Sequence, residues 1–579
     1  MYIQRNVTHI KGKEYRATLL CSKYREGGKV KTKVEANLSH LSEELINGIQ
    51  NLLKGKPVSK TGQKTEKTVS IKDIGVSRCI DYAYPFLLNS IMKDSHIDEV
   101  LSRTLPSCNV GLVKAMILGK IITGGSKLSI FNWLNRETDI ANLSGVDTTS
   151  LKVKDLYRVL GSIPYYQQTI DSKWFRYHHT SSRMYLYDIT STYFEGTQNV
   201  LSAFGYNRDK KSGKKQICIG LICDETGFPL KATVFDGNTA DTTTVREQIL
   251  SLKNELGIKE LVFVGDRGMQ IIYHLENDED LKETDINFIT GLTRSEIEDL
   301  LKRQVIQLSL FSKDLAEVTE GNKRYVLSVN PELEASGKLY HQHKKDHTDM
   351  LLKLIETSWK NRKFQNMENE LNLQKGKSKN KKLKTSFSFK DIDNYKKRVY
   401  KVLDTCKMTS YYSIDTIDND TFKINFNREA FEHTESLFGK YIVCTNVNDK
   451  TLNTEMVRAQ YKNLQHVEHV FRDLKSDNIC IRPVYHRNEA QTRGHVQICI
   501  FAYAIIHEME KKIYPFLKTF NETNNSQLSF NDIIAEIKNV KLCELKIGKN
   551  EKLFAIPDLN PIQKKIFKLF NFNPDDMIT

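Results

Sequence analysis

The sequence lacks the features that mark disulfide-rich, secreted and membrane-spanning proteins. Its ten cysteines are scattered without a C-x-x-C pair, and the closest two, Cys218 and Cys223, lie in an apolar run, so we expect buried, reduced thiols rather than zinc ligands or disulfides. The opening residues, MYIQRNVTHIKGKEY, contain no apolar core of the signal-peptide type. The most apolar stretch, Val496 to Ile506, is too short to span a bilayer and is interrupted by Gln497. We therefore expect a cytoplasmic protein with no membrane partner.

Positive charge, in contrast, is plentiful and is concentrated in two segments. The 579 residues include 86 Lys and Arg against 71 Asp and Glu, a formal charge of +15. Residues 1–67 hold 14 basic and 6 acidic residues, and residues 360–401 hold 14 and 4, so the rest of the chain has a net charge of −3. Two basic modules on a nearly neutral body indicate a polyanionic partner, most often nucleic acid.

From about residue 184 the pattern is that of an α/β domain. Apolar runs predict five strands, at 184–190, 216–223, 229–235, 260–266 and 286–292. A helix is predicted between the third and fourth strands, from Thr242 to Leu256. Three strands, a helix and a further strand form the strand order of ribonuclease-H-like domains. Asp188 and Asp266 are predicted at strand ends, where ligand and metal sites of open α/β sheets cluster.

The chain before this domain divides into two regions. Residues 1–70 are predicted to form a basic β-hairpin around Lys11-Gly12-Lys13, a helix from Ser39 to Leu53 and a linker. Residues 71–180 have helical spacing, and the two helices around Gly124-Gly125 fit either a helix-turn-helix or, more commonly, a plain helical bundle.

The chain after the first core part (181–300) divides into three regions. Residues 301–450 are predicted to be a strand-rich insertion, with strands at 322–329, 421–427 and 439–446. Its tract KGKSKNKKLK (375–384) is either a solvated loop or a loop that orders on nucleic acid. Residues 451–515 begin with a long helix, and residues 516–579 form a C-terminal region with a helix at Phe530 to Val540 capped by Ser529.

The helix that begins near Asn453 carries the third acidic candidate, Glu468. On a continuous helix, an arc of about 80° collects five polar residues: Tyr461, Gln465, Glu468, Arg472 and Lys475. The adjacent arc is apolar and would pack on the sheet; it contains Val467, Val470, Phe471 and Leu474. Taken alone, Glu468 and Arg472 are an ordinary surface pair at i, i+4.

Together with Asp188 and Asp266, Glu468 completes a carboxylate set suited to two Mg²⁺ ions. Two such ions, about 4 Å apart, can activate an attacking oxygen and stabilise a leaving one in phosphodiester chemistry. The Tyr, Arg and Lys on the same helix face could then hold DNA phosphates.

At these motifs the chain resembles bacterial insertion-sequence transposases of the DDE type, in the IS-four superfamily and most closely its IS-sixteen-thirty-four branch. The superfamily helix signature is Y-(2)-R-(3)-E-(6)-K, which Tyr461, Glu468 and Lys475 fit; the Arg position is Leu464, a departure, with Arg472 one turn beyond Glu468. Blocks similar to the family are YDITSTYFEG around Asp188, VFDGNTAD (234–241), VGDRGM around Asp266, IRPVYHR (481–487) and GHVQICIFAYAI (494–505). The opening, from Tyr2 to Leu38, is also similar. The resemblance covers nearly the whole chain and is weakest at 300–420.

This resemblance implies a fold, an activity and a site. The fold is α/β, a ribonuclease-H-like core interrupted by the insertion, with helical and β-hairpin N-terminal regions; residues 71–180 are expected to bind the ends of the DNA element. The activity is cleavage at the ends of an insertion sequence and joining of the 3′-OH ends to target DNA by two-metal in-line transfer. Asp188, Asp266 and Glu468 are implied as ligands of two Mg²⁺, for which Mn²⁺ can substitute. The partners are the terminal inverted repeats, target DNA and a second subunit of a homodimer; a bacterial, nucleoid-associated location follows.

Further DNA contacts are weighed against plainer interpretations. Tyr461, Arg472 and Lys475 are expected at phosphates near the scissile bond. Arg267, Arg482, His486, Lys11 and Lys13, with Arg16, are candidates for DNA contacts, although a solvated side chain or a local salt link explains Arg267, Arg482 and His486 equally well. Asn238 and Asp241 fit turn chemistry, and a buried core position is the default for Trp133, Trp174 and Trp359.

Two rival functions share these residues. A ribonuclease-H-like nuclease without joining activity would have the same metal site. A non-catalytic DNA-binding repressor derived from a transposase would belong to another class, but the intact acidic set argues against it.

Overall fold

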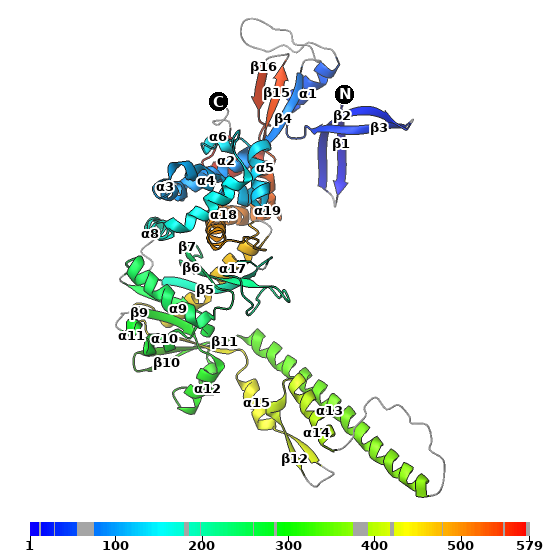
Figure 1. Cartoon of the computed structure of the whole chain (residues 1–579), viewed down its shortest axis with the longest axis vertical. Coiled ribbons are helices and arrows are strands. Elements are labelled where there is room, and N and C mark those ends of the chain that lie inside the picture. The colour runs from blue at the N-terminus through cyan, green and yellow to red at the C-terminus, as the bar shows by residue number, and fades with distance from the viewer. Residues whose placement is uncertain are drawn as a thin grey trace. The chain divides into compact units, whose positions relative to one another are not determined.

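The computed structural model divides the chain into two compact units, each described here by itself. The first comprises Met1–Ile286 and Lys462–Thr579, and the second Asn287–Tyr461. The described residues are 1–10, 13–27, 29–54, 74–178, 184–196, 198–258, 260–282, 286–374, 392–416, 422–476, 479–547 and 551–574. Figure 1 shows the chain with many of its elements labelled.

The first unit begins with a small β-sheet module. Strands β1 (Tyr2–Ile10), β2 (Lys13–Glu26) and β3 (Lys29–Asn37) pair antiparallel in that order. The predicted hairpin is therefore confirmed, with a third strand added. Helix α1 (Glu43–Leu53), capped by Ser42, follows the sheet. Leu38, Leu41 and Ile46 form the centre of the core shared by sheet and helix.

A second sheet of this unit joins segments that are far apart in the sequence. Strand β4 (Ile74–Asp81) pairs with β15 (Lys541–Ile547), which pairs with β16 (Glu551–Ala555), all antiparallel. Helix α19 (Phe530–Lys538) begins at the predicted cap, Ser529, whose hydroxyl accepts from the Asp532 N–H. Helix α20 (Pro561–Leu569) packs against it.

The predicted helical region is a bundle assembled around the long helix α18 (Glu489–Asn524). Its members are α2 (Ala83–Asp94), α3 (Ile97–Ser102), α4 (Ser107–Thr123), α5 (Lys127–Arg136), α6 (Ile140–Leu143), α7 (Val153–Ser162) with the 3₁₀ turn η2 (Ile163–Tyr166), and α8 (Gln167–His178). Trp133 and Trp174 are buried, as the default interpretation predicted.

Within the bundle, α4 ends at Gly124, whose φ of +59° is the left-handed conformation of a helix cap. Among the described helices no single one is long and apolar enough to cross a membrane. Helices α4 and α5 together meet the length and composition test but are bent by 98° at this turn.

The α/β part of the first unit contains four strands in the order β8-β5-β6-β7. They are β5 (Met184–Tyr193), β6 (Gln216–Cys223), β7 (Pro229–Phe235) and β8 (Leu261–Gly265), and only β5 and β8 are parallel. Every residue of β6 is buried. Helix α17 (Leu464–Lys475) packs on β5, and α18 packs on β7. These strands confirm the predicted pattern and give a mixed α/β core.

The connections around this sheet are mostly helical. Helix α9 (Asp241–Leu250) runs on as a π-helical turn, η3 (Ser251–Glu255), so that the helix predicted over 242–256 is present. Beyond β8 follow the 3₁₀ turn η4 (Arg267–Met269), α10 (Ile271–Asn277) and α11 (Glu279–Lys282).

The second unit contains strands in the order β10-β11-β14-β9 and a separate hairpin. The four strands are β9 (Ile286–Gly291), β10 (Leu315–Glu320), β11 (Lys323–Val329) and β14 (Lys440–Thr445), and the hairpin is β12 (Tyr412–Thr416) with β13 (Phe422–Phe426). The helices are α12 (Arg294–Lys302), α13 (Pro331–Gln374), α14 (Ile392–Thr405), α15 (Arg428–Ser436) and α16 (Thr454–Lys462), with 3₁₀ turns η5 (Leu308–Ser312) and η6 (Thr409–Tyr411).

Two expectations for the second half of the chain are wrong in detail. All three predicted strand runs of the insertion are strands, but its longest element, α13, is a helix of 44 residues. The Lys-rich tract lies outside the described residues. The helix predicted to run from Asn453 is divided at Asn463: the His466 N–H donates to the Asn463 carbonyl, a tighter turn than an α-helix. Tyr461 therefore belongs to α16 and Glu468 to α17.

Candidate active site

Asp188 and Asp266 lie on adjacent strands of the first unit. The parallel pairing of β5 with β8 ends with Tyr187 opposite Gly265, so the next residues of the two strands are the two aspartates. Strand β5 itself continues to Tyr193, because its last residues pair with β6. Asp188 is therefore inside its strand and not at the predicted strand end, although it lies where the parallel neighbour stops.

Glu468 lies on α17, which packs on the strand that carries Asp188. The predicted apolar face is confirmed, since the four residues assigned to it are all buried: Val467, Val470, Phe471 and Leu474. Glu468, on the adjacent face of the helix, is exposed. Its position is thus set by the burial of its neighbours, which orients the helix.

The three carboxylates are close enough to influence one another electrostatically. The pKa of Asp188 is raised to about 7, firstly because burial penalises the charged form and also because of the negative charges of Asp266 and Glu468. The Ile189 N–H, which donates to Asp188 Oδ1 at 2.7 Å, and the Arg208 guanidinium oppose this rise. A partly buried acid surrounded by two further acids is a site that favours a bound cation.

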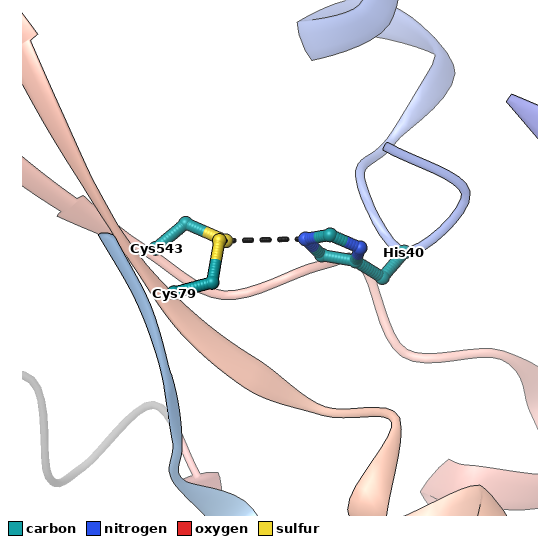
Figure 2. Close-up of side chains that lie close together, drawn as sticks. All are labelled: His40, Cys79 and Cys543. Atoms are coloured by element: carbon teal, nitrogen blue, oxygen red, sulfur yellow. Dashed lines mark hydrogen bonds between the residues drawn. The ribbon is translucent and has the colours of Figure 1, made fainter. Parts of the chain in front are cut away.

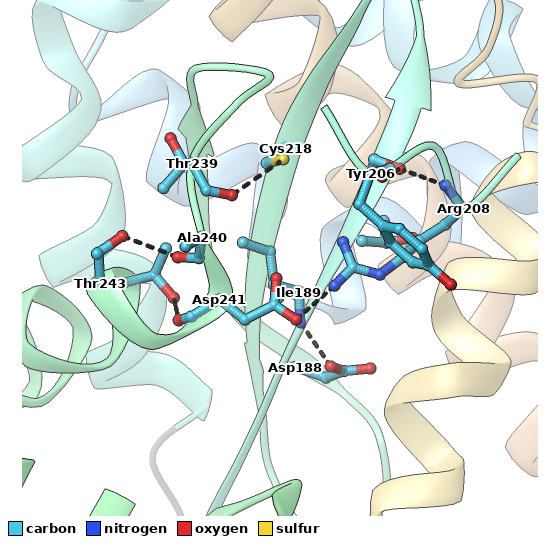
Figure 3. A network of polar contacts seen from close by, with 12 residues as sticks. Asp188, Ile189, Tyr206, Arg208, Cys218, Thr239, Ala240, Asp241 and Thr243 are labelled. Atoms are coloured by element: carbon cyan, nitrogen blue, oxygen red, sulfur yellow. Dashed lines mark hydrogen bonds and ion pairs between the residues drawn. The ribbon is translucent and has the colours of Figure 1, made fainter. Parts of the chain in front are cut away.

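Arg208 is the positive group nearest to this cluster that the sequence did not single out. Its Nη2 donates to Asp241 Oδ2 at 2.5 Å, and its guanidinium lies 5.8 Å from the centre of the Tyr206 ring. Figure 3 shows Asp188, Arg208 and Asp241 together. Asp241 is the first residue of α9 and follows a turn closed by a hydrogen bond from the Thr239 N–H to the Asp236 carbonyl. The predicted turn is therefore present, but it does not account for the ion pair that Asp241 forms with Arg208. No sequence signal distinguished Arg208 from the other basic residues around it.

Lys475 and Arg482, both candidates for contacts with DNA phosphates, are each paired with the same buried carboxylate. Lys475 Nζ donates to Asp209 Oδ1 at 3.0 Å, and also to Thr190 Oγ1 and the Ser191 carbonyl, each at 2.8 Å. Arg482 forms an ion pair with the same Asp209 oxygen. Burial lowers the pKa of Lys475, opposed by the charge of Asp209. Of the two interpretations of Arg482, a DNA contact or a local salt link, the structure contains the local salt link.

The exposed basic candidates are Arg267 and Arg472. Arg267 directly follows Asp266 and opens η4. Arg472 lies one turn beyond Glu468, with its Nη2 2.7 Å from His469 Nε2. Both are exposed, so both can reach a ligand that approaches the carboxylates.

Two other candidates, His486 and Tyr461, have surroundings that the sequence did not predict. His486 is packed against the Tyr157 and His495 rings, and burial lowers its pKa to about 3, so it is neutral near pH 7 and supplies no positive charge to a phosphate. Tyr461, in the second unit, lies against Gly291, where an added Cβ would be 2.3 Å from the tyrosine hydroxyl. Lys11 lies outside the described residues, and Lys13 is the first residue of β2.

Two family models match parts of the chain. Residues 165–505, more than half of the chain, match the family described as "Transposase DDE domain". Residues 3–66 match "IS1634 family transposase, N-terminal domain". No curated protein is significantly similar to the chain. Among solved structures, a cryo-EM structure of the piggyBac transposase synaptic complex with hairpin DNA is similar over 84% of this chain and 78% of that chain, at 8% identity and a TM-score of 0.35.

Proposed function

The chain belongs to the DDE-domain transposases, in the IS1634 family, and from this premise we propose that Asp188, Asp266 and Glu468 are the catalytic carboxylates of this DNA transposase. The observation that carries the proposal is the placement of Asp188 on β5, beside the end of β8 that leads into Asp266 and against α17, which carries Glu468. Both of these acids contribute to the raised pKa of Asp188. Two strands and a packed helix hold them on rigid elements, as a precise catalytic site requires.

Transposases with this domain use divalent metal ions, and the residues present fit Mg²⁺. The donors are all carboxylate oxygens, which hard divalent cations prefer. The raised pKa of Asp188 also fits, because a bound cation would favour the charged form that burial and the two neighbouring acids disfavour. When bound, two such ions activate the attacking oxygen and stabilise the leaving oxygen of an in-line displacement at phosphorus.

The remaining residues of the site then have separable roles. Arg267 and Arg472, exposed beside two of the acids, are proposed to hold DNA phosphates and to orient the scissile bond. Lys475, Arg482 and Asp209 are proposed to hold β5 and α17 together, since Lys475 on α17 donates to Thr190 and Ser191 of β5. The same site would first cut at an element end and then use the new 3′-OH to attack target DNA.

We further propose that the core is ribonuclease-H-like and that two subunits act together on two element ends. Support for the fold is the order β8-β5-β6-β7, with one parallel pair and a helix that carries the third acid. The helical region formed by residues 71–180 and the basic β1–β3 module are proposed to bind the terminal inverted repeats.

A joining assay tests this function against its rivals. Duplexes that carry the terminal repeats with free 3′-OH ends, read from the DNA flanking the gene, are incubated with the protein, Mg²⁺ and a target plasmid. Joined product is expected from the native chain and from Glu455→Gln, an exposed residue on α16, and none from Glu468→Gln. Repeats still joined to their flanking DNA are incubated in parallel. Cutting of these repeats without joining of the free ends would instead identify a nuclease, and end binding without any cutting a DNA-binding repressor.

A further inference from the structure

Two cysteines and a histidine from three distant segments meet in the first unit. His40 lies in the turn between β3 and α1, Cys79 on β4 and Cys543 on β15. Figure 2 shows the imidazole directed at the two sulfur atoms. This departs from the sequence-based expectation of buried thiols without a metal, because Cys79 is exposed and has a thiol partner 464 residues away.

The geometry of the three groups is set by backbone pairing. Cys79 and Cys543 are directly opposite in the antiparallel register of β4 and β15. Their sulfurs are 2.6 Å apart, and His40 Nε2 is 3.1 Å from Cys543 Sγ. One donor atom from each residue lies within 4.8 Å of the other two. The strands thus present both thiols on one side, and the histidine covers them.

The electrostatics favour a thiolate, the form of cysteine that binds metals. The pKa of Cys79 is lowered to about 5, mainly by a hydrogen bond with Cys543 and additionally by His40 and the charge of Lys541. The pKa of Cys543 is raised, because the neighbouring Cys79 sulfur holds the negative charge.

We propose that His40, Cys79 and Cys543 bind a thiophilic divalent cation, zinc, as a structural clasp. Thiolate and imidazole are the soft and borderline ligands that select zinc over magnesium. Zinc bonds of about 2.3 Å to sulfur in a tetrahedral site would separate the sulfurs to about 3.7 Å, which needs a rotamer adjustment of about 1 Å. Three protein ligands leave a fourth position, which the adjacent open cleft of about 820 Å³ leaves accessible to water.

A clasp here has a structural purpose. The core of the N-terminal module is small, with Leu38, Leu41 and Ile46 at its centre, and small cores are commonly reinforced by a structural metal. His40 belongs to this module, whereas both cysteines belong to the β16-β15-β4 sheet. A shared cation would therefore fasten the basic β1–β3 module to that sheet, in a site whose chemistry differs from that of the carboxylates.

Cobalt substitution in the full-length protein tests the clasp. Metal-free, reduced protein is titrated with Co²⁺, and one equivalent is expected to produce sulfur-to-cobalt charge transfer and the strong visible bands of a tetrahedral site. Cys79→Ser and Cys543→Ser should lose these bands, and His40→Ala should weaken binding at least tenfold. Cys108→Ser, which removes an exposed thiol in α4, is the matched control and should leave them unchanged.

A second measurement needs no variant and guards against misfolding. Zinc should protect Cys79 from alkylation, monitored by peptide mass spectrometry, while Cys108 continues to react. The proposal is overturned if the native chain gives no tetrahedral cobalt spectrum, if the two serine variants retain it, or if Cys79 and Cys543 form a disulfide in protein prepared under reducing conditions. None of these outcomes depends on DNA cleavage, so the clasp and the catalytic assignment can fail independently.

Discussion

Asp209 shows how a single residue can organise the surroundings of the three acids without being one of them. Its side chain is only 2% exposed and accepts from Lys475 and Arg482. Removing the charge would leave two cations with a neutral partner, one of them largely buried. We predict that Asp209→Asn lowers the free energy of unfolding by about 3 kcal/mol, the lower end of the range for breaking a buried pair, because Arg482 is partly solvated.

Urea denaturation measures this loss. Asp558→Asn, a substitution of the same type at an exposed position, is the control and should unfold at the native urea concentration. An unchanged midpoint for Asp209→Asn would show that the two cations do not depend on this carboxylate.

His178 makes a pH-dependent contribution to stability. It is packed against Trp174 and Phe228, its Nε2 lies 2.9 Å from the Ser95 carbonyl, and burial lowers its pKa to about 4. In the unfolded chain this histidine has a pKa near 6.5. Between about pH 4 and pH 6.5 the unfolded chain therefore binds a proton at His178 that the folded chain does not. This contribution is fully present above about pH 6.5 and is lost as the pH falls toward 4.

We predict that His178→Gln flattens the stability profile between these two values by up to about 1.4 kcal/mol per pH unit. Unfolding midpoints measured from pH 7 to pH 4.5 check this. Parallel profiles for the native chain and the variant would mean that the histidine is protonated in the folded state.

At the scale of elements, the contact of α18 with α7 depends on a glycine. A Cβ at Gly494 would lie 2.1 Å from the Leu160 carbonyl oxygen, whereas a Cβ at Gly161, on α7, would meet only the flexible Gln491 side chain at 3.4 Å. We predict that Gly494→Ala destabilises the protein by about 1–3 kcal/mol, because the helices must separate. Gly161→Ala should be neutral or slightly stabilising, because alanine favours a helix. Thermal unfolding of the two variants decides this, and equal melting temperatures would contradict the close approach.

Some of the helices and strands could be predicted from the sequence, and others could not. The five strands of the α/β pattern and the α19 cap are confirmed, because apolar runs and capping residues are local signals. Helix α13 was not predicted, since its 44 residues are rich in charge and lack a sustained apolar stripe. The break at Asn463 was also missed, because a helical wheel assumes continuity.

The residues of the candidate site likewise divide into those that the sequence predicts and those that it does not. Asp188, Asp266 and Glu468 stood out because each follows or lies within a strongly patterned element. Arg208 and Asp209 lie between β5 and β6, in a stretch without periodicity. Their ion pairs depend on residues 33 and 266 positions away, and only tertiary structure brings those residues near.

At the level of the whole molecule, the basic segments and the proposed catalytic acids occupy different parts of the sequence. Basic residues are concentrated in 1–67 and 360–401, and the acids of the site lie in the nearly neutral remainder. We predict that replacing the six lysines of 375–384 by glutamine reduces the salt dependence of DNA binding, because each lost phosphate contact lowers the slope by about 0.9. Titrations between about 50 and 200 mM salt measure the slope, and an unchanged slope would show that this tract does not contact DNA.

We propose that Asp188, Asp266 and Glu468, which come from three separate elements, form one catalytic centre. Its most direct test is the cleavage of element ends by Asp188→Ala, measured beside end binding by the same protein and beside Asp236→Ala, a nearby acid outside the cluster, as control. We predict that Asp188→Ala binds the ends with native affinity and cuts none of them, while Asp236→Ala does both. Metal-dependent cleavage retained by Asp188→Ala would contradict the account.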